Sequence, residues 1–339
     1  MKEKVKAIIM FSGGLDSTLA AKLMLDEGIE LLAIHLTSPF CTCDRRTSGC
    51  RATSVLMAEQ LGIKMVTLPK GKDYFDIVRN PRHGYGSALN PCIDCRIFGL
   101  KKAKERMEKE GARFIVTGEV LGQRPMSQMR DVLRFIEKKS GLEGLLLRPL
   151  SAKHFPPTIP EIEGWVDRNN LLSIAGRSRK EQLMLAEKYD LKDYPCPAGG
   201  CLLTDRMFAP RLKDLFEHCD TIENYEFNLL KVGRHLRLGS GEKLIIPRSE
   251  AENTKLQTLG KGRIVLVCPE GFPGPVIGVE DANSGLPYRE IALSFERYAK
   301  RAKEPYPASI RYPDGKREDV CLAKVSNAHP EELERYLIR

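Results

Sequence analysis

Short apolar runs alternate with segments of helical periodicity over the first 150 residues of the chain. Apolar runs of strand length occupy residues 5–11, 30–36, 64–68, 114–117 and 145–147. Apolar residues recur at helical spacing over residues 18–25, 52–61 and 97–110. Strands that alternate with helices predict an α/β fold with a doubly wound parallel sheet. Such sheets bind their ligands at the carboxyl ends of the strands.

The pattern changes in the last third of the chain. Helical periodicity over residues 161–167 and 178–189 is followed by short apolar runs with Gly and Pro between them. These runs predict strands at residues 229–238, 243–246, 264–268 and 276–279. Pro313-Asp314-Gly315 predicts a hairpin turn. We therefore expect two domains, a doubly wound domain over residues 1–220 and a smaller α+β domain over residues 221–339.

Composition places the chain among soluble globular proteins. Its 339 residues suit two or three domains. We see neither a signal peptide nor an apolar stretch long enough to span a membrane, so we expect a cytosolic protein. The net charge of +9 has the sign that an RNA partner requires, although many soluble proteins are equally basic. Phosphate contacts are predicted for a basic cluster in the second domain, Lys231, Arg234, His235 and Arg237, with a solvated sheet edge as the alternative for His235.

The first strand leads directly into Ser12-Gly13-Gly14-Leu15-Asp16-Ser17, and a helix follows. Glycine at a helix N-terminus lets backbone N–H groups approach phosphate oxygens, and Ser12 and Ser17 add hydroxyl donors. No Lys follows the glycines. Asp16 therefore indicates a Mg²⁺ ion between the carboxylate and the phosphates. The loop resembles the PP-loop of ATP pyrophosphatases, which cleave ATP to AMP and pyrophosphate while adenylating a substrate.

The chain has ten cysteines, which in a reducing cytosol indicate metal binding or catalysis. Three groups follow predicted strands or begin helices: Cys41, Cys43 and Cys50; Cys92 and Cys95; Cys196 and Cys201. A helix start favours thiolate at the Cys92 pair. Three interpretations remain open. The thiols hold a [4Fe–4S] cluster with an open iron, or one carries a persulfide that another resolves, or they hold a structural zinc.

The residues from Thr117 to Gln123, followed by Ser127-Gln128, resemble the T-G-E-x-L-G-Q-x-x-S-Q block of ThiI-type tRNA 4-thiouridine synthases. Arg148-Pro149-Leu150 and Lys153 resemble that family's R-P-L and its functional Lys. Cys92 and Cys95 are similar to cysteines of MnmA-type 2-thiouridylases and TtuA-type thiolases. Cys201 resembles the second cysteine site of MnmA, and Cys196 the third cluster ligand of the TtuA group. Residues 231–253 resemble the RNA-binding module of NFACT proteins.

These resemblances imply ATP-dependent thiolation of a tRNA uridine, giving 4-thiouridine or, alternatively, 2-thiouridine, with sulfide or a persulfide carrier as sulfur donor. They give catalytic roles to Asp16, Lys153, Cys92 and Cys201. They place ATP on Ser12, Gly13, Gly14, Asp16, Ser17, Leu36, Thr37, Gly118 and Gln123. They make Cys92, Cys95 and either Cys196 or Cys201 the candidate cluster ligands, with zinc as the alternative. A PP-loop ligase or amidase acting on a small molecule is the other function, and the extra basic domain argues against it.

Overall fold

The chain folds as two units, Met1–Thr204 and Asp205–Arg339. The structure is a computed structural model, and it describes residues 4–41, 50–191, 194, 201–282, 285–299, 304–323 and 329–339. Helix α8 (Ala209–His218) groups with the second unit, so the division precedes the expected boundary at residue 220. Its side chains explain why. Arg211 donates to the carbonyl oxygen of Leu230 at 3.0 Å, and Asp214 pairs with Arg237 at 2.9 Å.

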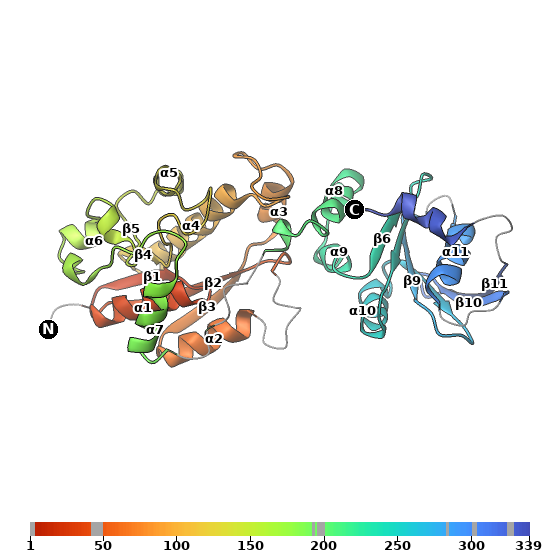
Figure 1. The fold of residues 1–339 in the computed structure, drawn as a ribbon, viewed down its shortest axis with the longest axis horizontal. Coiled ribbons are helices and arrows are strands. Elements are labelled where there is room, and N and C mark those ends of the chain that lie inside the picture. The colour runs from red at the N-terminus through yellow and green to blue at the C-terminus, as the bar shows by residue number, and fades with distance from the viewer. Residues whose placement is uncertain are drawn as a thin grey trace. The chain divides into compact units, whose positions relative to one another are not determined.

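A five-stranded parallel sheet forms the centre of the first unit, with the order β3-β2-β1-β4-β5 (Figure 1). Its strands are β1 (Lys6–Met10), β2 (Glu30–Thr37), β3 (Lys64–Pro69), β4 (Phe114–Thr117) and β5 (Leu146–Leu147). The register is regular, with Lys6 opposite Glu30 and Ala7 opposite Phe114. The predicted parallel α/β fold is confirmed. Strand β1 lies in the middle, so the loop after it opens at the centre of the carboxyl edge.

Helices cover both faces of this sheet. They are α1 (Leu15–Asp26), α2 (Cys50–Gln60), α3 (Lys72–Arg79), α4 (Cys92–Lys109), α5 (Arg130–Ser140), α6 (Ile159–Ile162) and α7 (Lys180–Lys188). In Figure 1, α1, α2 and α7 lie below the sheet, and α4 and α5 lie above it. Alternate residues of β1 serve the two faces, since Ile9 packs with Leu19 of α1 whereas Ile8 packs with Leu100 of α4. Burial on both faces explains why β1 is an uninterrupted apolar run.

The second unit is built on a six-stranded antiparallel sheet with the order β11-β10-β8-β9-β7-β6. Its strands are β6 (Arg234–Arg237), β7 (Lys243–Ile246), β8 (Val265–Pro269), β9 (Ile277–Glu280), β10 (Tyr306–Arg311) and β11 (Arg317–Leu322). Its helices, besides α8, are α9 (Asn224–Leu229), α10 (Glu250–Gly260) and α11 (Tyr288–Tyr298), and a 3₁₀ segment spans Pro330–Tyr336. The predicted α+β class and the hairpin at Pro313 are confirmed.

One predicted strand of this unit is wrong in its first half. Residues 229–238 were expected to be extended, but α9 ends at Leu229 and β6 begins at Arg234. Gly233 separates them with a φ of +67°, and a Cβ there would lie 2.4 Å from the carbonyl oxygen of Ile246. This left-handed turn against β7 needs glycine. Across the described parts of both units, every helix is too short or too polar to cross a membrane.

Candidate nucleotide and sulfur site

The loop from Ser12 to Ser17 connects β1 to the first turn of α1, as predicted. Gly13 has a φ of +73°, and a Cβ on it would lie 2.6 Å from the Cα of Ser54 in α2, so only glycine fits. Gly14 is the N-cap of α1, and its N–H donates to Ser12 Oγ at 3.3 Å. The hydroxyls of Ser12 and Ser17 lie 3.1 Å apart. Two hydroxyls and a helix N-terminus thus meet at one point, which suits a phosphate group.

Asp16 lies in the first turn of α1, and its two carboxylate oxygens differ in their hydrogen bonding. Its Oδ2 accepts a hydrogen bond from Gln123 Nε2 at 3.1 Å. Its Oδ1 is buried and has no hydrogen-bond partner among the described residues. A buried carboxylate oxygen without a donor is costly unless a ligand or ion satisfies it. The residues present therefore fit a Mg²⁺ ion held by one carboxylate and by phosphate oxygens.

The end of β4 packs directly on this loop through Gly118. A Cβ on Gly118 would lie 2.6 Å from the carbonyl carbon and oxygen of Asp16 and 2.6 Å from the amide nitrogen of Ser17. Backbone contacts backbone here, so any side chain would displace the first turn of α1. This contact brings Gln123 to Asp16 and explains the glycine in the T-G-E block.

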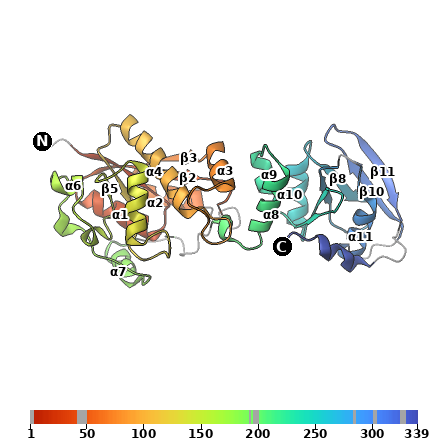
Figure 2. The ribbon, with the colours of Figure 1, turned by 90° about the horizontal axis from the view of Figure 1, so that it is seen from above.

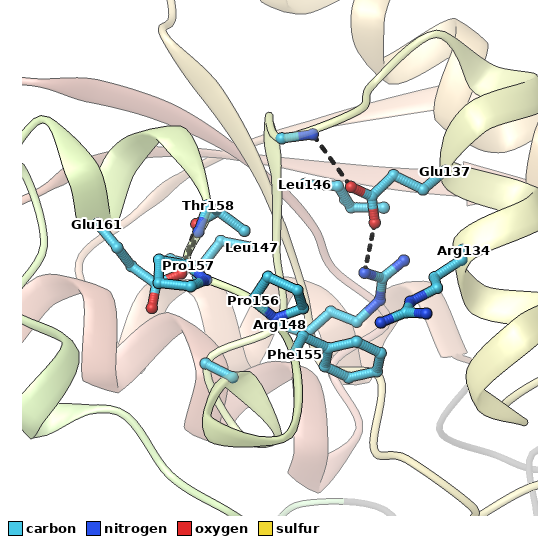
Figure 3. Close-up of a pocket in the computed structure, with 12 residues that line it drawn as sticks. Arg134, Glu137, Leu146, Leu147, Arg148, Phe155, Pro156, Pro157, Thr158 and Glu161 are labelled. Atoms are coloured by element: carbon cyan, nitrogen blue, oxygen red, sulfur yellow. Dashed lines mark hydrogen bonds and ion pairs between the residues drawn. The ribbon is translucent and has the colours of Figure 1, made fainter.

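Glu119 directly follows Gly118, and its buried carboxylate forms two ion pairs, here called the Glu119 hub. Its carboxylate pairs with Arg96 of α4 and with Arg148 Nε, the latter at 3.1 Å. Arg148 also pairs with Glu137 of α5 at 2.8 Å (Figure 3). Removing one member of such a network would leave an uncompensated buried charge. Glu119 and the R-P-L arginine therefore share one structural role, to join the phosphate loop to α4 and α5.

A cavity of about 210 Å³ lies beyond this network, next to β5 (Figure 3). The ring of Phe155 forms part of its wall, with the guanidinium of Arg148 at 5.5 Å. Lys153 lies in the neighbouring 3₁₀ turn, Ala152–His154. Its side chain is exposed, and its ammonium donates to the carbonyl oxygen of Asn169 at 3.0 Å. The expected role of Lys153 at the phosphates stays a prediction.

The expected adenine position lies at the carboxyl end of β2. Leu36 and Thr37 are half-buried there. Gly99 of α4 lets the side chain of Leu36 approach, because a Cβ on Gly99 would lie 2.9 Å from Leu36 Cδ1. His35, expected to be a core histidine, is buried, and its Nδ1 lies 3.0 Å from the carbonyl oxygen of Phe11. These residues are therefore placed at the edge where a nucleotide would lie, but their role in binding stays a prediction.

The thiol of Cys95 makes two close contacts with polar side chains. Its Sγ lies 2.9 Å from Lys70 Nζ and 3.2 Å from the hydroxyl of Tyr74. Burial alone would raise the pKa of Cys95, but the Lys70 ammonium and the Tyr74 hydroxyl outweigh it and hold that pKa below its ordinary value. Cys95 is therefore the thiol that the fold prepares as a thiolate.

Cys92 and Cys201 lie near Cys95 but are not prepared in this way. Burial raises the pKa of Cys92 above its ordinary value, so the thiolate expected from its helix-start position is wrong for this residue. Burial also raises the pKa of Cys201, to about 12, and the charges of Cys95 and Cys41 act in the same direction. The helix start thus brings the thiols together, but local burial and Lys70 decide which of them ionises.

Cys41 and Cys201 face each other across an isolated antiparallel bridge. The amide of Leu202 donates to the carbonyl oxygen of Phe40 at 2.8 Å, so the two cysteines form a non-hydrogen-bonded pair. Residues paired in this way have Cα atoms about 4.5 Å apart, within the range that a disulfide spans. Cys41 thus lies beside Cys201, at the sheet edge that its place after the second strand predicted.

Among the described residues, no three Cys, His, Asp or Glu side chains are grouped as metal ligands. Cys43 and Cys196, and the side chain of Cys50, lie outside the described residues. The predicted cluster ligands Cys92, Cys95 and Cys201 share a region, and their role as ligands stays a prediction. Cys219, Cys268 and Cys321 lie in the second unit and form no disulfide with a described residue.

Sequence reasoning missed Lys70 and Tyr74. Lys70 directly follows β3, and Tyr74 lies in the first half of α3. The ammonium of Lys70 also lies 4.1 Å from the centre of the Tyr74 ring. The position of Lys70 could have been predicted from the sequence, because a residue that directly follows a parallel strand lies at the same sheet edge as the phosphate loop. Its partner Cys95 lies on a different element, and pairing of this kind appears only in the folded chain.

The expected RNA contacts of the second unit need correction. His235 is fully buried, with its Nε2 2.9 Å from the carbonyl oxygen of Val232, so it is neither a phosphate contact nor a solvated edge. Arg237 is held by Asp214 at 2.9 Å and by Asp281 at 2.7 Å. Arg234 lies over the ring of Tyr298 at 4.6 Å, and Lys231 donates to Asn228 Oδ1 at 3.0 Å. Two of the four predicted contacts thus serve the fold.

Comparison with known proteins agrees with both halves of this description. Residues 2–154 match the family model described as thiamine biosynthesis protein (ThiI), and residues 233–337 match the NFACT protein RNA binding domain. A probable tRNA sulfurtransferase of Methanosarcina mazei is 30% identical over 121 residues, covering 35% of this chain and 29% of that protein. The tRNA-specific 2-thiouridylase MnmA of Pseudomonas entomophila is 23% identical over 221 residues, covering 62% of this chain and 55% of that protein.

Among solved structures, a 4-thiouridine synthetase–RNA complex with bound ATP is similar, with 18% identity and a TM-score of 0.36, covering 67% of this chain and 52% of that one. The chain spans less than two thirds of the length of both curated relatives. The matched residues contain the phosphate loop, Gly118, Glu119, Arg148 and Lys153 in the first unit. The chain thus has a ThiI-like domain of the PP-loop type over residues 2–154 and a domain similar to the NFACT protein RNA binding domain over residues 233–337.

Proposed function

We propose that this protein is an ATP-dependent tRNA sulfurtransferase, which adenylates a uridine carbonyl and replaces its oxygen with sulfur. One observation carries the proposal. A phosphate loop with an unsatisfied Asp16 oxygen and a thiol activated by Lys70 open at the same edge of one sheet. The ThiI-like domain and the RNA-binding domain support the same activity and favour 4-thiouridine as product, with 2-thiouridine as the alternative. We expect it to act in the cytosol, and the RNA-binding domain disfavours a small-molecule ligase or amidase.

The first step activates the base. The uridine carbonyl oxygen attacks the α-phosphorus of ATP, and pyrophosphate leaves towards the loop from Ser12 to Ser17. N–H groups at the start of α1 and the two serine hydroxyls stabilise the charge that develops on the leaving group. Asp16, oriented by Gln123, would hold the Mg²⁺ ion, which neutralises phosphate charge when bound. The base is then linked to AMP, which is a good leaving group.

The second step transfers sulfur through Cys95. Its thiolate attacks the outer sulfur of a donor persulfide, forms the Cys95 persulfide and releases the donor thiol. The outer sulfur then attacks the activated carbon of the base and expels AMP. Cys201 resolves the base–disulfide intermediate by attacking Cys95 Sγ, which releases the thiolated base and leaves a protein disulfide. An external dithiol reduces that disulfide, with Cys41 beside Cys201 as a further exchange partner.

A [4Fe–4S] cluster on Cys92, Cys95 and either Cys196 or Cys201 is the alternative sulfur carrier, with zinc as a structural alternative. No step above depends on either metal. The geometry of Cys95 favours the persulfide route, because Lys70 and Tyr74 stabilise a free thiolate at this sulfur. The two routes differ in their requirement for iron.

Asp16→Asn is expected to lower AMP formation from ATP by roughly 100-fold or more, because the amide removes the charge that a Mg²⁺ ion requires. Product analysis should show AMP and pyrophosphate from the unmodified protein. Asp26→Asn, at the other end of α1, is the matched control and should leave the rate unchanged. ADP and phosphate as the only products would contradict the proposed reaction.

Lys70→Met is expected to slow alkylation of Cys95 by iodoacetamide at neutral pH. Removing the ammonium raises the pKa of Cys95, so the pH profile of its alkylation moves to higher pH. Mass spectrometry of the peptide that contains Cys95 measures the rate. Lys72→Met removes an exposed lysine two residues away and should change nothing. Equal rates in both variants would show that Lys70 does not activate this thiol.

Protein prepared without iron is expected to thiolate tRNA when a persulfide donor is supplied. A cluster would instead make anaerobic protein brown, with broad absorbance near ~400 nm from thiolate-to-iron charge transfer. Iron content, colour and thionucleoside yield should be measured on the same samples. If the yield rises and falls with iron, the persulfide route is wrong and the cluster route replaces it.

A protein that ends at Thr204 is expected to keep ATP binding and lose most of its affinity for tRNA, because the RNA-binding domain begins beyond that residue. Filter binding at several salt concentrations measures this. For the full chain, affinity should fall as salt rises, since phosphate contacts release counterions. Undiminished tRNA binding by the shortened protein would place the RNA contacts in the first unit.

A further inference from the structure

A basic segment lies against the residues that follow β4, although it is more than 50 residues away in the sequence. Arg177, Arg179 and Lys180 directly follow Gly176. The amide of Gly176 donates to the carbonyl oxygen of Leu121 at 2.7 Å, and Ala175 pairs in parallel with Leu121. A Cβ on Gly122 would lie 3.5 Å from the amide nitrogen of Gly176. The segment therefore lies against the T-G-E block, one residue from Gln123, which orients Asp16.

Helix α7 begins in this segment and lies along α1 (Figures 1 and 2). Its far end is fixed by Tyr189, whose ring lies 5.3 Å from the ammonium of Lys22, in the second half of α1. Its start is fixed by Gly176 beside the T-G-E block. The N-terminus of α7 therefore lies near the N-terminus of α1. Arg177, Arg179 and Lys180 belong to the end of α7 that lies toward the N-terminus of α1.

Two polar side chains near the start of α7 have buried atoms without a hydrogen-bond partner among the described residues. One is Arg179, through its Nε, whereas Arg177 and Lys180 are exposed. Gln182 is fully buried, and neither its amide nitrogen nor its amide oxygen has a partner. Gln182 lies three residues after Arg179 and thus on the same face of α7. Arg96, Arg148 and Arg168, by contrast, are all held in ion pairs.

We propose that Arg179, assisted by Arg177, binds the β- and γ-phosphates of ATP and the pyrophosphate formed from them. This proposal rests on the proposed function. Strands β2 and β4 flank β1 on opposite sides. The adenine is expected at the end of β2, whereas the basic segment lies beside the residues that follow β4. The basic segment therefore lies on the side of β1 that is remote from the expected base. The planar guanidinium group of arginine binds phosphate well. Lys153, the other candidate cation, donates to the carbonyl oxygen of Asn169.

The test compares Arg179→Gln with Lys188→Gln in the full chain. Both changes remove one positive charge from α7, but Lys188 is exposed at the opposite end of the helix. Calorimetry should measure the binding of Mg²⁺–ATP, inorganic pyrophosphate and AMP to each protein. We expect Arg179→Gln to bind Mg²⁺–ATP and pyrophosphate roughly 10- to 100-fold more weakly, as for loss of a charge-assisted hydrogen bond. AMP binding should be unchanged, and Arg179→Lys should recover part of the loss.

Each outcome decides a separate question. If the unmodified protein binds no ATP and forms no AMP, the proposed function itself fails. If it does both and Arg179→Gln binds pyrophosphate normally, the role of Arg179 is overturned while the proposed function stands. An equal loss of AMP and pyrophosphate binding also overturns it, because that result indicates a merely structural effect. Should Arg179→Gln fail to fold by circular dichroism, the exposed Arg177→Gln replaces it, with weaker pyrophosphate binding expected and normal binding refuting the proposal.

Discussion

The contact between the backbone of Gly118 and the first turn of α1 is the constraint on which the site depends. With no Cβ at residue 118, β4 ends against the carbonyl of Asp16 and the amide of Ser17. The residues after β4 are then fixed relative to the phosphate loop. Gln123 reaches Asp16, and Glu119 reaches Arg96 and Arg148. A side chain at residue 118 would displace this strand end from the phosphate loop and so disturb both sets of contacts.

The sequence predicted the first unit well, because its signals are local. Continuous apolar strands, helical periodicity between them and a glycine loop after β1 are each contained in about ten residues. The order of the strands is not contained in these local signals, and the fold supplies it. The strand predicted over residues 229–238 failed for a non-local reason, since the turn at Gly233 is imposed by the backbone of β7.

The sulfur chemistry could be predicted only in part. Cysteine spacing and strand-end placement located Cys41, Cys92, Cys95 and Cys201 in one region. Which thiol ionises depends on Lys70 and on burial, and both are properties of the folded chain. In the second unit, burial in the folded chain likewise decides which cations are exposed. Lys243 is 1% exposed and lies 3.3 Å from Glu280, so the charge counted along the sequence overstates the positive charge exposed at the surface.

The Glu119 ion pairs connect the phosphate loop to the helix that carries Cys95. Arg96 follows Cys95 directly in α4, and the carboxylate that it pairs with follows Gly118, which touches the nucleotide loop. Under the proposed function, nucleotide binding would therefore act on Cys95 through Glu119 and Arg96. Thermodynamic linkage requires the reverse to hold by the same factor. A cysteine that has received its sulfur and one that has not should therefore differ in their affinity for ATP, which would order the two substrates without any separate regulatory site.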